Sequence, residues 1–144
     1  MRYLAIDYGA KRTGLALCDK AETIASPLTV LATAGDLIDR ILLIIRREEI
    51  DAIVLGLPLN MDSTEGPQAR RVRDFAARLA KRTPLPIHLH DERLTSFDAG
   101  DKLAALDLTA AQKKKRLDAL AAAAILQAFL DHKRDNPPSP PDTP

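Results

Sequence analysis

Short apolar segments and amphipathic helical segments alternate along this chain, and their order restricts the fold more than any other feature. Three strand-like segments come first, at residues 2–7, 13–18 and roughly 22–31, joined by short links that suit antiparallel hairpins. Further strands then alternate with helices. Because strands separated by helices run parallel in one sheet, this order predicts an α/β fold: a five-stranded mixed sheet with helices on both faces.

The later elements are predicted from their periodicity and their end signals. They are a helix at 36–49, a strand at 52–58, a helix at 67–82, a strand at 86–90, a short helix from Ser96 to about 106 and a last helix at roughly 110–132. Asp36 is a candidate N-cap, and Pro67 suits a first helical position. Thr109 and Gln112 form a capping box for the last helix.

The length of 144 residues suits a single domain, which buries roughly two-thirds of its surface on folding. We expect this domain to span 1–135 and a disordered Pro-rich tail to span 136–144. The single cysteine, Cys18, excludes an intramolecular disulfide and is expected in the core. No apolar stretch approaches the ~20 residues that span a bilayer, and no secretory signal begins the chain, so we expect a cytoplasmic protein without a membrane partner.

Carboxylates follow two of the predicted strands. Asp7 ends the first strand, and Asp91 with Glu92 ends the fifth. Because ligands of open sheets gather outside the carboxyl ends of the strands, these acids can be neighbours in space. Each also has a purely structural explanation: Asp7 could satisfy backbone groups in a turn, and Asp91 and Glu92 could cap a turn or pair with Arg93.

A third acid, Asp118, lies on the last helix. The predicted inward face consists of Leu117, Leu120, Ala121, Ala124, Ile125 and Ala128, and Asp118 falls inside that arc. A carboxylate there is costly unless it is paired, with Lys114 as the alternative partner, or bound to a cation. Together, the acids would form an oxygen-rich site suited to Mg²⁺ or Mn²⁺ and to phosphodiester hydrolysis.

Basic side chains form clusters although the net charge is only +1. Such clusters can hold a polyanion, but a solvated helix surface explains each of them equally simply. The residues predicted to contact nucleic acid are Lys11, Arg12, Arg70, Arg71, Arg73, Arg93 and Lys114. The polar stretch "NMDSTEGPQ" after the strand at 52–58 is expected to be a mobile loop that lines the cleft.

Other polar and aromatic residues point to less specific roles. His88 and His90 share one face of their strand, where packing is favoured over metal binding. Only three phenylalanines and two tyrosines occur, which argues against a base-stacking platform. Recognition of nucleic acid should therefore rest on backbone and shape.

The segments "AIDYGAKRTGLAL", "GLPLNMDSTEGPQARRVRDFAARL", "DERLTS" and "KKKRLDALAAAAIL" resemble the YqgF family, also called RuvX, over residues 2–131. The resemblance implies an RNase H-like fold and a cytoplasmic bacterial nuclease in 5′ maturation of the 16S rRNA precursor. It also implies catalytic acids at Asp7, Glu92 and Asp118, with Asp91 as a further metal ligand.

The chain departs from the wider RNase H-like pattern at the end of the fourth strand. Many RNase H-like nucleases carry an acid where this strand ends, whereas this chain has Gly56-Leu57-Pro58. The resemblance implies that an acid of "DER" substitutes for it, and it leaves open whether Asp91 or Glu92 is the ligand.

We therefore predict a metal-dependent nuclease that acts on precursor rRNA, in contact with pre-ribosomal particles, as a monomer or weak homodimer. One alternative is a resolvase-like endonuclease that acts on branched DNA, and another is a non-catalytic RNA-binding assembly factor. A third is an actin-like or sugar-kinase-like phosphotransferase, because D-x-G after a first strand also opens their phosphate-binding hairpin. Those folds need two such domains, and this chain has room for one.

Overall fold

The computed structural model of the chain describes residues 1–95 and 109–136. Its strands are β1 (Tyr3–Tyr8), β2 (Arg12–Cys18), β3 (Ala25–Ala32), β4 (Ala52–Leu57) and β5 (Ile87–Asp91). Its helices are α1 (Leu37–Arg47), α2 (Pro67–Ala80) and α4 (Ala110–Asp135), with a 3₁₀ turn, η1 (Glu92–Leu94), after β5. The predicted helix from Ser96 and the predicted tail beyond Asn136 lie outside the described residues.

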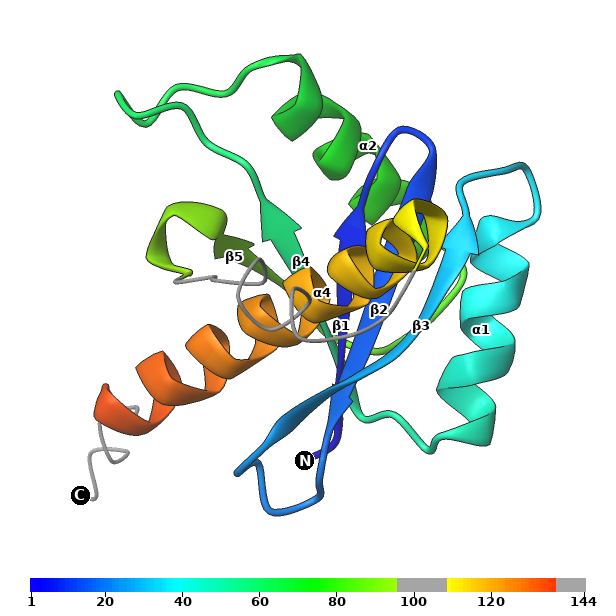
Figure 1. Cartoon of the computed structure of the whole chain (residues 1–144). Helices are drawn as coiled ribbons and strands as arrows, with labels where there is room; N and C mark the ends of the chain where they lie inside the picture. Colours follow the sequence, from blue (N-terminus) through cyan, green and yellow to red (C-terminus); the bar gives the residue numbers. More distant parts are fainter. Residues whose placement is uncertain (96–108, 137–144) are drawn as a thin grey trace.

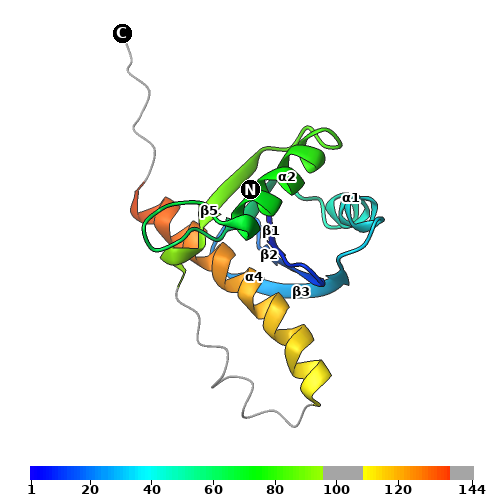
Figure 2. The same cartoon turned by 90° about the horizontal axis from the view of Figure 1, so that it is seen from above.

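The five strands form one mixed sheet in the order β3-β2-β1-β4-β5 (Figure 1). β1, β2 and β3 pair antiparallel, whereas β1 with β4 and β4 with β5 pair parallel. Helices α1 and α2 cover one face and α4 covers the other (Figure 2). The predicted fold class is confirmed, and the carboxyl ends of β1, β4 and β5 lie at one edge of the sheet.

The face beneath α1 and α2 is built from large apolar side chains. Alternate residues of the central strands, such as Leu4, Ile6 and Leu55, are fully buried there. Phe75 of α2 and Ile41 of α1 pack onto them and are fully buried as well. This face supplies most of the apolar burial that stabilises the domain.

The face beneath α4 is built from small side chains. Its fully buried residues include Ala5, Ala16, Cys18, Ala52, Ala122 and Leu126. Because alanine side chains are short, the helix backbone can lie close to the sheet. Cys18 is a core residue here, as expected, and its sulfur accepts a hydrogen bond from the Tyr3 amide at 3.3 Å.

The predicted inward face of the last helix is wrong except at Ile125, which is buried as predicted. The side chains of α4 that pack on the sheet are Ala119, Ala122, Ala123, Ile125, Leu126 and Leu130, whereas Leu117 is 38% exposed. Since the helix is rich in alanine, both faces have a similar hydrophobicity and the wheel gives no reliable direction. Asp118 therefore lies at the edge of the buried arc, about 80° from its centre.

The ends of several elements follow local hydrogen bonding. The capping box of α4 is confirmed: the Gln112 amide donates to Thr109 Oγ1 at 3.2 Å, and the Thr109 amide donates to Gln112 Oε1 at 3.0 Å. Pro67 begins α2 as predicted. Asp36 precedes α1 but makes no side-chain cap bond, because its backbone (φ −94°, ψ 7°) lacks the extended conformation of a capping residue.

β3 begins later than predicted because a turn occupies the preceding residues. Asp19 Oδ1 accepts from the amides of Thr23 and Ile24 at 2.8 and 3.0 Å, and Oδ2 accepts from the Thr23 hydroxyl at 2.5 Å. These bonds hold the chain in a turn up to Ile24.

No helix within the described residues is long and apolar enough to cross a membrane.

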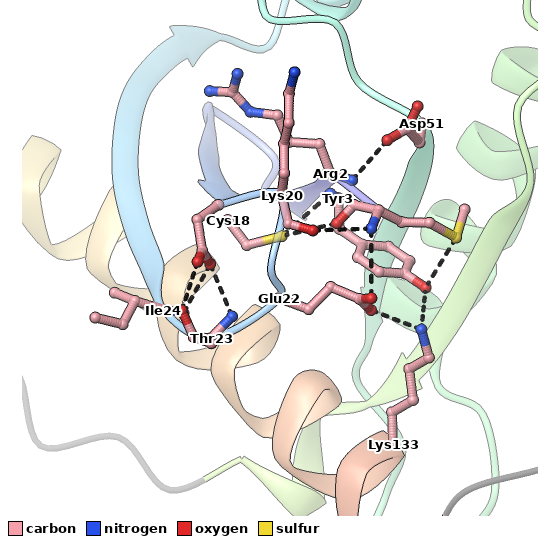
Figure 3. A network of polar contacts seen from close by, with 11 residues as sticks. Arg2, Tyr3, Cys18, Lys20, Glu22, Thr23, Ile24, Asp51 and Lys133 are labelled. Carbon is pink, nitrogen blue, oxygen red and sulfur yellow. Dashed lines mark hydrogen bonds and ion pairs between the residues drawn. The ribbon is translucent and has the colours of Figure 1, made fainter.

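A polar network joins the amino end of β1 to the end of α4 (Figure 3). Lys133 Nζ donates to Glu22 Oε1 at 2.6 Å and to the Tyr3 hydroxyl at 2.9 Å, and the amino group of Met1 donates to Glu22 Oε2 at 3.4 Å. This network lies at the end of β1 opposite to Asp7. It therefore fixes the last turns of α4 at a distance from Asp7.

Candidate active site

Asp7 and Glu92 line the same small pocket at the carboxyl edge of the sheet. Asp7 is the penultimate residue of β1, and Glu92 follows directly after β5. The pocket has a volume of about 170 Å³, and its other lining residues are Thr95, Ala121 and Ile125. The prediction that acids after the first and fifth strands meet in space is therefore confirmed for this pair.

Gly56 explains how an acid after β5 reaches this position. A Cβ atom built on Gly56 would lie 2.7 Å from Glu92 Oε1 and 2.7 Å from Cδ1 of Ile125. Separations below 3.0 Å would force a neighbour to move, here the ends of the Glu92 and Ile125 side chains. The Glu92 side chain therefore fills the space beside Gly56, which glycine leaves open.

Gly14 brings α4 close to Asp7. It is the cross-strand partner of Asp7 on β2, and a Cβ atom there would lie 2.1 Å from the carbonyl oxygen of Asp118. The backbone of α4 therefore packs directly on the backbone of β2 at this point. Gly14 is therefore required for the close packing of α4 on β2.

Burial raises the pKa values of both pocket carboxyls. The pKa of Asp7 rises from 3.8 to about 6, mainly through desolvation and secondarily through the charge of Asp118. The pKa of Glu92 rises from 4.5 to about 7 through desolvation, with smaller contributions from Asp7 and Asp91. Negative charge is therefore unfavourable in this pocket.

Asp118, the third predicted acid, pairs with Arg12, and its role as a metal ligand stays a prediction. Arg12 Nε donates to Asp118 Oδ2 at 2.6 Å, and both side chains are partly buried. Among the described residues, no group of three or more His, Cys, Asp or Glu side chains is arranged to hold a metal ion. The side chain of Lys114, the alternative partner considered for Asp118, lies outside the described residues.

Asp91 is not among the residues that line this pocket, and it pairs with Arg93. Both carboxylate oxygens accept from the guanidinium, with Arg93 Nη2 to Asp91 Oδ2 at 2.7 Å, and Oδ1 also accepts from the Arg93 amide at 3.0 Å. The structural explanation that an acid of "DER" pairs with Arg93 is thus confirmed for Asp91. Of the two neighbouring acids, Glu92 is the one at the pocket.

The loop between β4 and α2 is closed by its own hydrogen bonds. Leu59 and Glu65 form an isolated bridge, and the Asn60 amide donates to the Thr64 carbonyl at 2.9 Å. Arg93 Nη1 also donates to the carbonyls of Asn60 and Met61 at 3.2 and 3.3 Å. The loop lies beside the end of β5 but contributes no lining residue to the pocket.

The predicted basic residues of α2 differ in their surroundings. Arg70 and Arg71 are exposed, and Arg71 Nη1 donates to Gln68 Oε1 at 3.0 Å. Arg73 pairs with Glu65. Gln68 Nε2 donates to the Tyr8 carbonyl at 2.9 Å, which fixes the first turn of α2 next to the strand end that carries Asp7. Lys11 is exposed in the β1–β2 turn.

The two histidines of β5 pack against aromatic rings, as expected. His88 lies 5.4 Å from Phe129 and 6.1 Å from Tyr3 between ring centroids, and His90 lies 6.2 Å from Phe129. His90 is only 5% exposed, and burial lowers its pKa. These contacts hold β5 against α4.

The sheet order, the acids at the ends of β1 and β5 and the long helix across one face define an RNase H-like protein. The solved structure of *T. thermophilus* RuvC in complex with a Holliday junction substrate matches with a TM-score of 0.60 at 16% identity, over 94% of this chain and 96% of that chain. Fowlpox virus resolvase with its substrate Holliday junction DNA matches with a TM-score of 0.56 at 10% identity, over 92% and 98%. At these identities the similarity shows a common fold.

The chain belongs to the RuvX family, whose model, described as Holliday junction resolvase, matches residues 1–132. A relative from Anaeromyxobacter sp. (strain Fw109-5), named "Putative pre-16S rRNA nuclease", is 45% identical over 134 residues, which are 91% of this chain and 97% of the relative. A relative of the same name from Pelagibacter ubique (strain HTCC1062) is 36% identical over 133 residues, 91% and 88%. The predicted family is confirmed, and the chain is a nuclease.

Proposed function

We propose that this nuclease uses a divalent metal held by Asp7 and Glu92 to cleave the precursor of 16S rRNA near its 5′ end. The observation that carries the proposal is the pair of half-buried carboxylates in one pocket at the carboxyl edge of the sheet. The substrate comes from the names of relatives that share over a third of their residues with this chain. Such a substrate implies action in the cytoplasm, on pre-ribosomal particles.

The donor atoms at the pocket fit a hard cation. Asp7 and Glu92 supply carboxylate oxygens, which Mg²⁺ and Mn²⁺ prefer, and their raised pKa values mean that a nearby positive charge would relieve an unfavourable pair. Asp118 is the candidate third ligand. A bound ion would supply an activated water molecule and neutralise charge on the scissile phosphate.

Arg12 has a specific task in this proposal. It neutralises Asp118 in the metal-free protein through their ion pair. If Asp118 were to bind a metal, the guanidinium of Arg12 would become available to a phosphate group, which it could bind through two parallel hydrogen bonds. We therefore still predict that Arg12 contacts nucleic acid, through a contact that forms when the substrate binds.

The exposed cations Lys11, Arg70 and Arg71 would hold the phosphate backbone on either side of the pocket. Such contacts provide affinity without sequence information. Arg73 is paired with Glu65, so it would contribute less. Lys114 remains a predicted contact near the start of α4.

Cleavage of four-way DNA junctions is the second candidate function. It is favoured by the description of the family model and by the fold shared with two resolvases, both solved with junction DNA. Resolution of a junction requires paired cuts on two strands, so it needs two pockets, one from each of two protomers, whereas a monomer would make single cuts.

The two substrates are distinguished by one side-by-side assay. Purified protein is incubated with precursor 16S rRNA and with a four-way DNA junction, in Mg²⁺, in Mn²⁺ and in EDTA. We expect cleavage of the RNA that depends on metal, with a Glu92→Gln variant at least about 10³-fold slower. Junction cleavage at the higher rate would favour the second function. Binding to the RNA without cleavage in either metal would identify an assembly factor.

A further inference from the structure

Arg93 is a hydrogen-bonding hub between two segments that are about 30 residues apart in the chain. Its Nε and Nη2 atoms donate to Asp91, and its Nη1 atom donates to the carbonyls of Asn60 and Met61 and to the hydroxyl of Ser63 at 3.1 Å. Every nitrogen of the guanidinium therefore has an acceptor within the protein. Its side chain is 30% exposed, and it is the basic residue nearest in sequence to Glu92.

The topology of the sheet explains why these segments meet. Leu57, the last residue of β4, is the register partner of Asp91, the last residue of β5. The loop that leaves β4 and the turn that leaves β5 thus start side by side at the carboxyl edge. Arg93 connects them immediately after they separate, and Glu92 lies on the same turn, one residue before it.

The loop needs this support because its backbone is strained. Ser63 has φ of 72°, a conformation that residues other than glycine rarely adopt. Asp62 and Thr64 stabilise the loop from within, with the Thr64 amide donating to Asp62 Oδ1 at 3.0 Å. Arg93 adds the bonds from outside the loop, two of them to main-chain carbonyls.

We propose that Arg93 is a positioning residue that fixes the loop 59–65 and the Glu92 turn as one rigid unit, and that it does not contact nucleic acid directly. In this arrangement Asp91 is its anchor and has no role as a metal ligand. Lysine could not replace it, because only the planar fork of arginine can bind a carboxylate with two bonds and still reach the loop carbonyls. The expected effect of Arg93 on catalysis rests on the proposed function. The clasp, by which we mean the bonds from Arg93 that join the loop 59–65 to the Glu92 turn, does not.

The first measurement is hydrogen exchange of the loop amides in protein free of metal and nucleic acid. In Arg93→Lys we expect the amides of 59–65 to exchange at least about tenfold faster, while those of β1 and β4 stay unchanged. Asp91→Asn should produce the same local loss, and the double variant should add little to either single change. The matched control is Arg134→Lys, which alters an exposed Arg–Asp pair on the far end of α4. Unchanged loop protection in Arg93→Lys would overturn the clasp.

The second measurement separates positioning from binding, on whichever substrate the native protein cleaves. We expect kcat of Arg93→Lys to fall about tenfold or more, with KM, the salt dependence of binding and the melting temperature close to those of the native protein. A raised KM with a smaller salt slope and native kcat would mean that Arg93 binds nucleic acid, which would overturn the proposal. If the native protein cleaves neither substrate, the proposed function fails, and hydrogen exchange alone still decides the clasp.

Discussion

At the residue scale, the site depends on two carboxyls placed where ionisation is unfavourable. Asp7 and Glu92 are half-buried in one pocket, and no salt bridge within residues 1–95 and 109–136 reaches either of them. Such a pair lowers the free energy of unfolding at neutral pH. Each raised pKa means that the charged form is less favourable in the folded state than in the unfolded state. A protein retains such an arrangement where the charge has a use, and binding of a metal ion is that use in our account.

The cost of Glu92 predicts a pH-dependent gain in stability for Glu92→Gln. The folded-state pKa of about 7 lies above the ordinary 4.5, so the stabilising contribution of Glu92 is complete below about 4.5 and is lost as the pH rises through 7. Glutamine cannot ionise. The variant should therefore match the native protein at pH 4 and exceed its free energy of unfolding by on the order of 1 kcal/mol at pH 8.

This difference is measured by urea unfolding in EDTA at the two pH values. Glu65→Gln serves as the control, because its carboxyl is outside the pocket and pairs with Arg73. A Glu92→Gln variant that is equally stable relative to the native protein at both pH values would show that Glu92 ionises normally.

At the scale of elements, the close packing of α4 on β2 determines where Asp118 lies. Small side chains cover this face of the sheet, and Gly14 allows main chain to touch main chain. The sequence provides little evidence of this contact. Alanine makes the two faces of α4 almost equivalent in hydrophobicity, and the Arg12–Asp118 pair joins residues separated by 106 positions. Only the packed structure brings them together.

Gly14→Ala tests this packing directly. The added methyl group would meet the backbone of α4, which cannot move as a side-chain end can, so we expect a loss of at least about 2 kcal/mol in the free energy of unfolding. Gly35→Ala is the matched control, because nothing lies within 4 Å of its Cβ position, and it should be neutral or slightly stabilising. Equal stability of the two variants, measured by chemical denaturation, would contradict the packing described here.

The start of α2 is the element predicted to hold the nucleic-acid backbone. Replacing Arg70 and Arg71 together by alanine should weaken binding about tenfold at low salt and reduce the slope of log affinity against log salt by up to about 2. The loss should be similar for different nucleic-acid sequences. An Arg46→Ala, Arg47→Ala double variant makes the same change in charge at the last turn of α1. If both double variants bind alike, α2 has no special role.

At the scale of the whole molecule, the alternation of strands and helices was sufficient to predict the sheet. The alternation predicted that the later strands run parallel, and the rule for ligands at carboxyl ends predicted that Asp7 and Glu92 can be neighbours; the order of the strands comes from the structure. The inward face of α4 and the partner of Asp118 were not predictable, because both depend on how closely a helix approaches the sheet. The contacts of Arg93 were not predictable from the sequence either, because two of its acceptors are backbone carbonyls, which every residue has. The disorder of the tail after 136 stays a prediction.

The central claim is that the Asp7–Glu92 pocket binds a divalent metal and cleaves nucleic acid. It is tested most directly by single-turnover cleavage of precursor 16S rRNA as a function of Mn²⁺ concentration, for the native protein and for Asp7→Asn. We predict that the native rate rises to saturation with Mn²⁺. The variant should be at least about 10³-fold slower at every concentration, although it melts at the same or a higher temperature without metal. A folded Asp7→Asn protein that cleaves within tenfold of the native rate would contradict the claim.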